Sequence, residues 1–250
     1  MTSEPLPPAA SEESALARYH SVSSLAIVAL LLALLSALAL VHPLLWIVPV
    51  LAVVTALLAL RRITLGDEVL VGRGLAVCAL LLALFLAGCA SARFFTVRAA
   101  IYQEAQAVAT SWLNTLRQGD LDLAHQWTLT PGVRQRDRSQ LGAHYAQDLE
   151  LRAGRRQFFS REPARTLAAA GNNGEVRFTG NVEQAGDREV RLVVLQYELV
   201  PHRAGQEQKV PLRIVLRRTT SSGDGPSYWQ VVDVVDPDSE VDRLESDYFP

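Results

Sequence analysis

VSSLAIVALLLALLSALALV, residues 22–41, is an apolar run of about 20 residues interrupted only by three serines. A helix of that length crosses the hydrocarbon core of a bilayer, which is roughly 30 Å thick. The dipeptide His42-Pro43 ends the run, because proline disfavours helix, and further apolar runs follow over residues 44–60 and 75–95. None of the three shows the polar face of a helix from a soluble core. We therefore expect a three-span transmembrane module over residues 21–96.

Basic residues flank these runs unevenly. The loop of residues 61–74 carries three arginines and Arg18 precedes the first run, whereas the His42-Pro43 turn has no lysine or arginine. Because short basic loops stay in the cytoplasm, we expect a multi-pass protein of the inner (cytoplasmic) membrane with a cytoplasmic N-terminus. Three crossings place everything after Phe95 outside the cytoplasm. Two arginines at the end of the third run favour the opposite orientation: Arg93 and Arg98.

Two short motifs around the basic loop carry a family resemblance. They are Ala59-Leu60-Arg61-Arg62-Ile63 and Gly72-Arg73-Gly74-Leu75-Ala76. This part of the chain resembles a small bacterial membrane domain of unknown function with an apolar hairpin, a basic loop and a third span. This sequence departs from that domain at two places. Thr55-Ala56 stands where the domain usually has a Gly-His pair, and the third span of this chain lacks the glycines that are usual in the domain. The resemblance covers about a third of the chain and implies a bacterial integral membrane module without naming an activity.

Length and charge fit a membrane module joined to one further domain. The 250 residues leave about 150 for a soluble domain, which is enough for a core of its own. The net charge of −2 gives no reason to expect nucleic acid as a partner. Residues 1–20 are rich in proline and glutamate and are expected to form a disordered cytoplasmic tail. Residues 237–250 are expected to form an acidic C-terminal tail.

The two cysteines, Cys78 and Cys89, both lie in the third apolar run. They are too few for a disulfide framework or a zinc site, so we expect no metal and no cofactor. Leu86-Ala87-Gly88-Cys89 matches the bacterial lipobox, which makes lipidation of Cys89 one interpretation. The other is a helix end built from small residues, because a lipoprotein signal normally stands at the N-terminus rather than after two spans.

Helical patterns follow the third run. Residues 96–118 carry an apolar stripe at helical spacing that includes Trp112. Gly119 ends this helix, and Asp120 is a suitable N-cap for a short helix through Trp127. A third helix is expected over residues 139–151, with Leu141, Tyr145 and Leu149 facing inward.

The periodicity then changes to that of strands. Five runs show alternation or β-branched residues and are joined by hairpin-type connections, which predicts a mainly antiparallel sheet. Helices followed by strands indicate an α+β domain, with helices packed on one face of a curved sheet. The five runs are residues 165–169, 175–184, 189–200, 210–219 and 228–235.

The order of elements over residues 97–236 resembles the nuclear-transport-factor-like, or cystatin-like, cone fold. The residues that carry this resemblance are Ala109, Trp112-Leu113, Leu116, Gly119-Asp120 and Leu123-Ala124, with Tyr228-Trp229-Gln230-Val231-Val232-Asp233-Val234 as the closing strand. The fold hosts isomerases, dehydratases, binding modules and structural domains, so it selects no function by itself.

The resemblance implies that an enzyme of this fold would use an Asp or His at the mouth or wall of the cone as general base. The available candidates are His125, Asp122, Tyr145, Tyr197 and Asp233. No cluster has metal-ligand spacing, and no phosphate loop or nucleophile elbow is present. We therefore expect no catalytic activity. His125, Tyr145, Tyr197 and Asp233 are kept as candidate pocket residues.

Eight arginines crowd the stretch from residue 134 to 165, and the acidic tail follows at the end of the chain. Such a basic surface suits either an anionic partner or plain solvation. The sequence thus predicts an integral membrane protein that presents an extracytoplasmic domain for binding or assembly, with the bilayer and an envelope protein or anionic molecule as partners. The alternative is a tethered small-molecule-binding or enzymatic cone. The arginines are Arg134, Arg136, Arg138, Arg152, Arg155, Arg156, Arg161 and Arg165.

Overall fold

The computed structural model describes residues 24–41, 43–65, 72–187, 189–201, 209–220 and 227–237. The chain divides into two compact units, Met1–Arg98 and Ala99–Pro250. The predicted N-terminal tail and all but the first residue of the predicted acidic tail lie outside the described residues, as do His42 and residues 66–71 of the connection between the second and third apolar runs.

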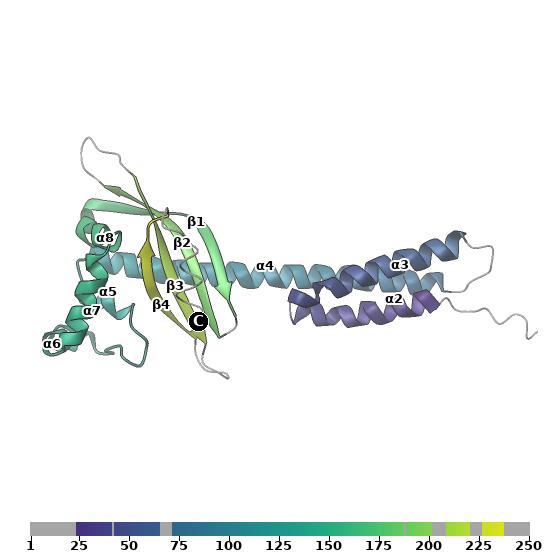
Figure 1. Ribbon diagram of the computed structural model, residues 1–250, viewed down its shortest axis with the longest axis horizontal. Coiled ribbons are helices and arrows are strands. Elements are labelled where there is room, and N and C mark those ends of the chain that lie inside the picture. The colour runs from purple at the N-terminus through teal and green to yellow at the C-terminus, as the bar shows by residue number, and fades with distance from the viewer. Residues whose placement is uncertain are drawn as a thin grey trace, which may run out of the picture. The chain divides into compact units, whose positions relative to one another are not determined.

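The first unit is built from apolar helices (Figure 1). Its last helix, α4, has 45 residues and runs on into the second unit, so the third predicted span and the predicted helix at 96–118 are one helix. Residues 90–118, which cover the junction of the two, contain neither proline nor glycine that could end the helix. The elements are α2 (Ser24–Leu35), η1 (Ser36–Leu40), η2 (Pro43–Trp46), α3 (Ile47–Leu65) and α4 (Arg73–Arg117).

Small residues make the contacts between these helices. Alanines from α2, α3 and α4 form one buried cluster, in which Ala29, Ala56 and Ala83 are fully inaccessible. Large aliphatic side chains such as Leu31 and Leu81 point outward and are 55% and 61% exposed. Two described helical stretches, Leu44–Leu65 and Arg73–Arg117, are long and apolar enough to cross a membrane, and Ser24–Leu40 is a shorter apolar helix.

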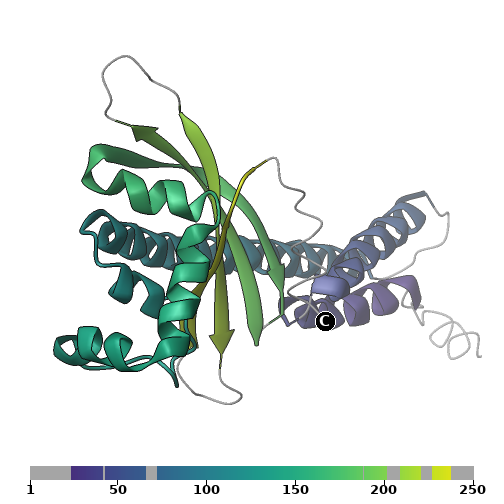
Figure 2. The ribbon, with the colours of Figure 1, turned by 60° about the vertical axis from the view of Figure 1, so that its left-hand side comes forward.

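The second unit packs helices against one four-stranded antiparallel sheet of order β1-β2-β3-β4. Helices α5 to α8 lie together on one side of it (Figure 2). The α+β class predicted from the sequence is confirmed for this unit. Its helices are the end of α4, α5 (Leu121–Gln126), η3 (Arg138–Gln140), α6 (Leu141–Gln147), α7 (Leu149–Ser160), α8 (Ala164–Ala170) and η4 (Gly171–Asn173); its strands are β1 (Gly174–Gly186), β2 (Val190–Pro201), β3 (Val210–Thr220) and β4 (Ser227–Val235).

The core lies between α4 and the sheet. Alternate residues of the central strands, such as Leu195 of β2 opposite Ile214 of β3, are fully buried and face the helices. Trp112 of α4 is also fully buried, and its indole N–H donates to the Ala124 carbonyl at 3.1 Å. The apolar stripe predicted on residues 96–118 is therefore confirmed as a core face, and it holds α5 as well as the sheet.

Two predictions about local structure were wrong. Residues 165–169, predicted as a strand, lie in helix α8, whose sequence ARTLAAA is rich in alanine, the best helix former. The predicted helix over residues 139–151 is split at Asp148, whose carboxylate caps α7 by accepting from Glu150 and Leu151 N–H at 2.9 and 3.0 Å. Because the helix restarts there, Leu149 is 72% exposed instead of buried.

Candidate functional site

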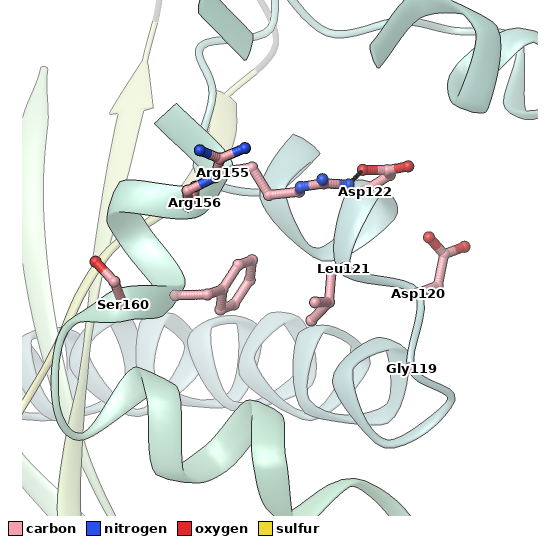
Figure 3. A pocket seen from close by; sticks show the side chains of 8 residues that line it. Gly119, Asp120, Leu121, Asp122, Arg155, Arg156 and Ser160 are labelled. Carbon is pink, nitrogen blue, oxygen red and sulfur yellow. Dashed lines mark hydrogen bonds and ion pairs between the residues drawn. The ribbon is translucent and has the colours of Figure 1, made fainter. Parts of the chain in front are cut away.

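An open pocket of about 470 Å³ lies between the start of α5 and the C-terminal half of α7. Figure 3 shows Asp120 on one side of it and Arg156 and Ser160 on the other. A volume of this size suits a small organic ligand. The pocket is lined by Gly119, Asp120, Leu121, Asp122, Arg155, Arg156, Phe159 and Ser160.

The α4–α5 connection shapes one wall. Gly119 has φ of +77°, a left-handed conformation that suits glycine, and it lets the chain leave α4. Asp120 then starts α5, because its carboxylate accepts from the Leu123 N–H at 3.0 Å. The predicted N-cap is thus confirmed. One carboxylate oxygen of this exposed residue, Oδ1, makes that bond, and the other makes no hydrogen bond or ion pair with a residue that the structure describes.

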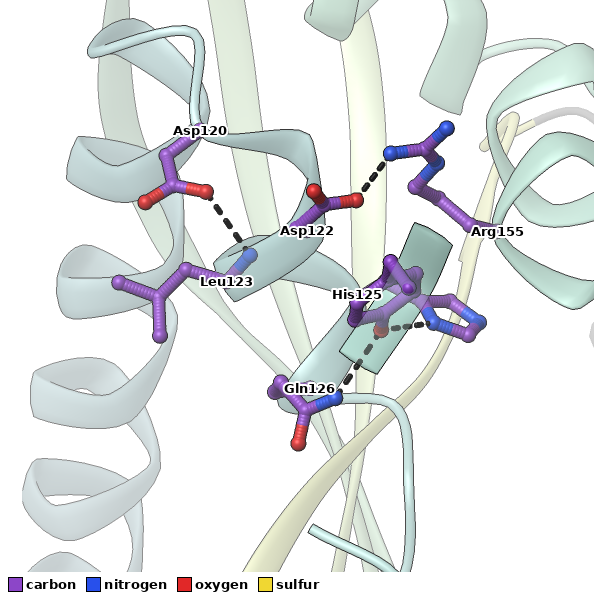
Figure 4. Close-up of polar contacts among 7 residues, drawn as sticks. Asp120, Asp122, Leu123, His125, Gln126 and Arg155 are labelled. Carbon is purple, nitrogen blue, oxygen red and sulfur yellow. Dashed lines mark hydrogen bonds and ion pairs between the residues drawn. The ribbon is translucent and has the colours of Figure 1, made fainter. Parts of the chain in front are cut away.

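The opposite wall comes from α7. Arg155 forms an ion pair with Asp122, and its guanidinium lies over the Tyr145 ring, 5.5 Å from the centroid. Figure 4 shows this pair beside the His125 ring. The neighbouring Arg156 is exposed and forms no hydrogen bond or ion pair with any residue that the structure describes. The floor consists of two half-buried side chains, Leu121 and Phe159, which pack on the core.

A buried polar network lies behind the ion pair. The Tyr145 hydroxyl is 2.6 Å from His125 Nδ1 and accepts from Gln126 Nε2 at 3.1 Å (Figure 4). The side-chain oxygen of Gln126, Oε1, in turn accepts from the backbone N–H of Gln135 at 2.8 Å. The hydroxyl has one proton to donate and two lone pairs that accept, so the direction of its contact with Nδ1 depends on the tautomer of His125.

Burial sets the protonation of this network. Burial lowers the pKa of His125, the charge of Arg155 lowers it further, and Asp122 opposes both. Burial also raises the pKa of Tyr145. Both groups are therefore neutral near pH 7. His125 is only 4% exposed, and its ring lies against Gly154, where an added Cβ would be 3.4 Å from Nε2.

The four candidate pocket residues do not meet in one place. His125 and Tyr145 are brought together, but Tyr197 of β2 lies in the sheet core against the Phe178 ring, where burial raises its pKa to about 12. Asp233 is on β4, and its carboxylate accepts from the Val234 N–H at 2.8 Å. None of the four lines the pocket between α5 and α7.

Sequence reasoning did not single out the residues that do line the pocket. Asp120 was identified only as a helix cap, Asp122 only as one candidate base, and Arg155 and Arg156 only as members of a basic stretch. No spacing rule relates Asp122 to Arg155, because helix α6 and two connections separate them. The signal appears only when α5 and α7 are placed side by side.

Within the described part of the chain, no group of three or more His, Cys, Asp or Glu residues is arranged to hold a metal ion. Cys78 is exposed and Cys89 is half-exposed on α4, and both are free thiols. No family model, curated protein or solved structure matches this chain. The two family resemblances therefore stay resemblances.

Proposed function

We propose that this protein is a multi-pass membrane protein whose second unit is an extracytoplasmic domain for binding or assembly. The observation that carries the membrane part is the inverted packing of the first unit. Alanines fill its interior, whereas leucines, valines and isoleucines cover its outside. A soluble bundle buries its large apolar side chains. In a bilayer, small residues let helices approach closely while large ones face lipid.

The charged and aromatic residues bracket an apolar slab of suitable thickness. Arg73 starts α4, and Arg93 is 20 residues further on, which is about 30 Å along a helix and matches a hydrocarbon core. Near Arg93, the rings of Trp46 and Phe94 meet at 5.4 Å, and aromatic rings are enriched at membrane interfaces. At the other end, Arg61 and Arg62 close α3.

The arginine distribution supports a cytoplasmic N-terminus, and the resemblance of this unit to a small bacterial membrane domain is the reason to propose the inner membrane of a bacterium. The end of the bundle with Arg61, Arg62 and Arg73 carries more positive charge than the end with Arg93, and the turn at Pro43 carries none. Basic short loops remain in the cytoplasm. The second unit then faces an envelope partner, either a protein or an anionic molecule.

Filled packing of the second unit supports binding rather than catalysis. Trp112 and Leu195 are fully inaccessible where a cone enzyme would need a cavity. The described pocket opens on the outside, between α5 and α7. The side chain best suited to proton transfer, His125, is buried behind the Asp122–Arg155 pair and does not line that pocket.

Protease accessibility in spheroplasts tests the topology. A protein with distinct N-terminal and C-terminal tags should lose only the C-terminal tag to external protease, and lose both after detergent lysis. Protection of the C-terminal tag with cleavage of the N-terminal tag would overturn the proposal. Mass analysis of the membrane-bound form checks the Cys89 interpretation as well, because lipidation there would remove residues 1–88 and add lipid mass.

A further inference from the structure

The pocket between α5 and α7 carries opposite charges on opposite walls. Asp120 has a carboxylate oxygen free of its capping bond on the α5 side, and Arg156 on the α7 side forms no ion pair with a described residue. Asp122 and Arg155 neutralise each other between them. One unpaired negative and one unpaired positive group therefore remain for a ligand.

An apolar floor joins the two charged walls. Leu121 and Phe159 line the pocket and pack on the core beneath it. Ser160 donates to the Gln157 carbonyl at 2.9 Å, which leaves its oxygen lone pairs as acceptors at the Arg156 wall. Figure 3 shows Leu121 between Asp120 and the α7 side chains. An apolar surface with a few polar groups around it is typical of a small-ligand site.

From this arrangement, and resting on the binding role proposed above, we infer that the pocket binds a short linear zwitterion of the peptide class. The ligand ammonium pairs with Asp120, its carboxylate pairs with Arg156, and its aliphatic body lies on Leu121 and Phe159. A guanidinium binds a carboxylate through two parallel hydrogen bonds, which lysine cannot match. Because the two charges stand on opposite walls, a peptide with separated termini fits better than a single α-amino acid.

Ligand-observed saturation-transfer NMR on the full chain in deuterated detergent micelles measures this binding. The probes are Ala-Ala-Ala, its N-acetyl form, which lacks the ammonium, and its C-terminal amide, which lacks the carboxylate. Each blocked peptide should bind about two- to fivefold more weakly than the free tripeptide, because each loses one exposed ion pair of about 0.4 to 1 kcal/mol.

Two variants locate the site, and two more control for overall charge. Asp120→Asn should weaken binding of the free peptide about two- to fivefold but leave binding of the N-acetyl peptide unchanged, and asparagine still caps α5. Arg156→Gln should weaken the free peptide similarly but leave the amide unchanged. The controls are Asp137→Asn and Arg161→Gln, which are exposed and lie outside the pocket. They should bind all three probes as the parent chain does.

Three results would overturn the inference: no saturation transfer from the free tripeptide, pocket variants that bind as the parent does, or controls that lose as much as the pocket variants. These failures are distinguishable from failure of the proposed function. The micelle measurement is independent of the protease result, so an exposed domain that does not bind the tripeptide removes the pocket assignment alone. Binding that is insensitive to the pocket variants moves the ligand elsewhere and keeps a binding role.

Discussion

One hydroxyl group, that of Tyr145, satisfies two buried polar groups at once. It lies 2.6 Å from His125 Nδ1 and accepts from Gln126 Nε2 at 3.1 Å. Tyr145→Phe leaves both groups without this partner, so we expect the free energy of unfolding to fall by about 1–3 kcal/mol. Denaturant unfolding in micelles, followed by tryptophan fluorescence, measures the loss. The control Tyr228→Phe should change stability by less than about 0.5 kcal/mol, and equal losses in both variants would refute this account.

The same network predicts how stability depends on pH. Burial and Arg155 hold the pKa of folded His125 below its unfolded value of 6.5, with Asp122 opposing and the Tyr145 hydroxyl facing Nδ1. Below pH 6.5 the unfolded state therefore binds more protons than the folded state. The contribution of neutral His125 to the free energy of unfolding is fully present above pH 6.5 and is lost as the pH drops toward the folded pKa.

Melting temperatures measured between pH 8 and about 5 test the direction of this pH dependence. The parent chain should lose stability below pH 6.5, and His125→Gln should show a flatter dependence over the same range. The comparison is between slopes, because the substitution also changes the hydrogen bond to Tyr145 and hence the absolute stability. Identical slopes in both proteins would show that groups other than His125 control the response.

At the scale of elements, an irregular segment, residues 127–134, covers one edge of the sheet. The Val231 N–H of β4 donates to the Trp127 carbonyl at 2.9 Å. Arg134 fixes this segment, because it donates to the Leu129 carbonyl at 2.9 Å and the Trp229 carbonyl at 2.7 Å. An edge strand with free N–H and C=O groups invites association with other chains, so this guanidinium contributes to solubility as well as stability.

Arg134→Lys is therefore expected to be costly although it keeps the charge. A lysine ammonium cannot bind carbonyls in two directions as the planar guanidinium does. We therefore expect the free energy of unfolding to fall by about 1–3 kcal/mol. Thermal unfolding and the rate of proteolysis within residues 127–134 measure the effect. Arg136→Lys, at an exposed neighbouring position, serves as the control and should behave like the parent chain. A neutral Arg134→Lys would mean that β4 holds the segment unaided.

Element types were largely predictable where one period continued over many residues. The core stripe on residues 96–118 and the four strands after residue 174 were identified because burial on one face imposes a regular pattern. The prediction failed over residues 165–169, where a short alanine-rich helix has too few turns to display a period. It failed at Asp148, because a capping carboxylate looks the same in sequence as a solvated one.

The pocket was much less predictable than the fold. His125 and Tyr145 were both chosen as candidates, but their 2.6 Å contact depends on how α5 and α6 pack. Tyr197 and Asp233 belong to strands, and sequence gives no measure of their distance from His125. Arg155 and Arg156 differ from the other six arginines of the basic stretch in lining the pocket, which depends on how α7 packs. Such sites arise from tertiary packing, which local patterns do not encode.

At the scale of the whole molecule, the two units show opposite relations between side-chain size and burial. In the second unit the fully buried side chains include Trp112, Leu195 and Ile214, as in any water-soluble core. Among the described residues of the first unit, the buried side chains are small and include alanines, Ser36 and Pro49, while Phe85 is 66% exposed. One helix, α4, takes part in both arrangements. The difference is explained if lipid is the solvent of one unit and water that of the other.

Cys78 allows that explanation to be tested without disturbing the fold. Its side chain is exposed on α4, five residues after Arg73, which is about 7.5 Å along the helix from that charge. If the bundle spans a bilayer, Cys78 faces lipid at that depth and a charged, membrane-impermeant maleimide cannot reach it.

In a Cys89→Ser background reconstituted in nanodiscs, we expect no labelling of Cys78 by intact mass and complete labelling after addition of SDS. An Arg136→Cys variant of the same background, with its thiol exposed in the second unit, should gain one label before SDS. Rapid labelling of Cys78 in nanodiscs would show that the outward leucines meet water, and the membrane assignment would fail with it.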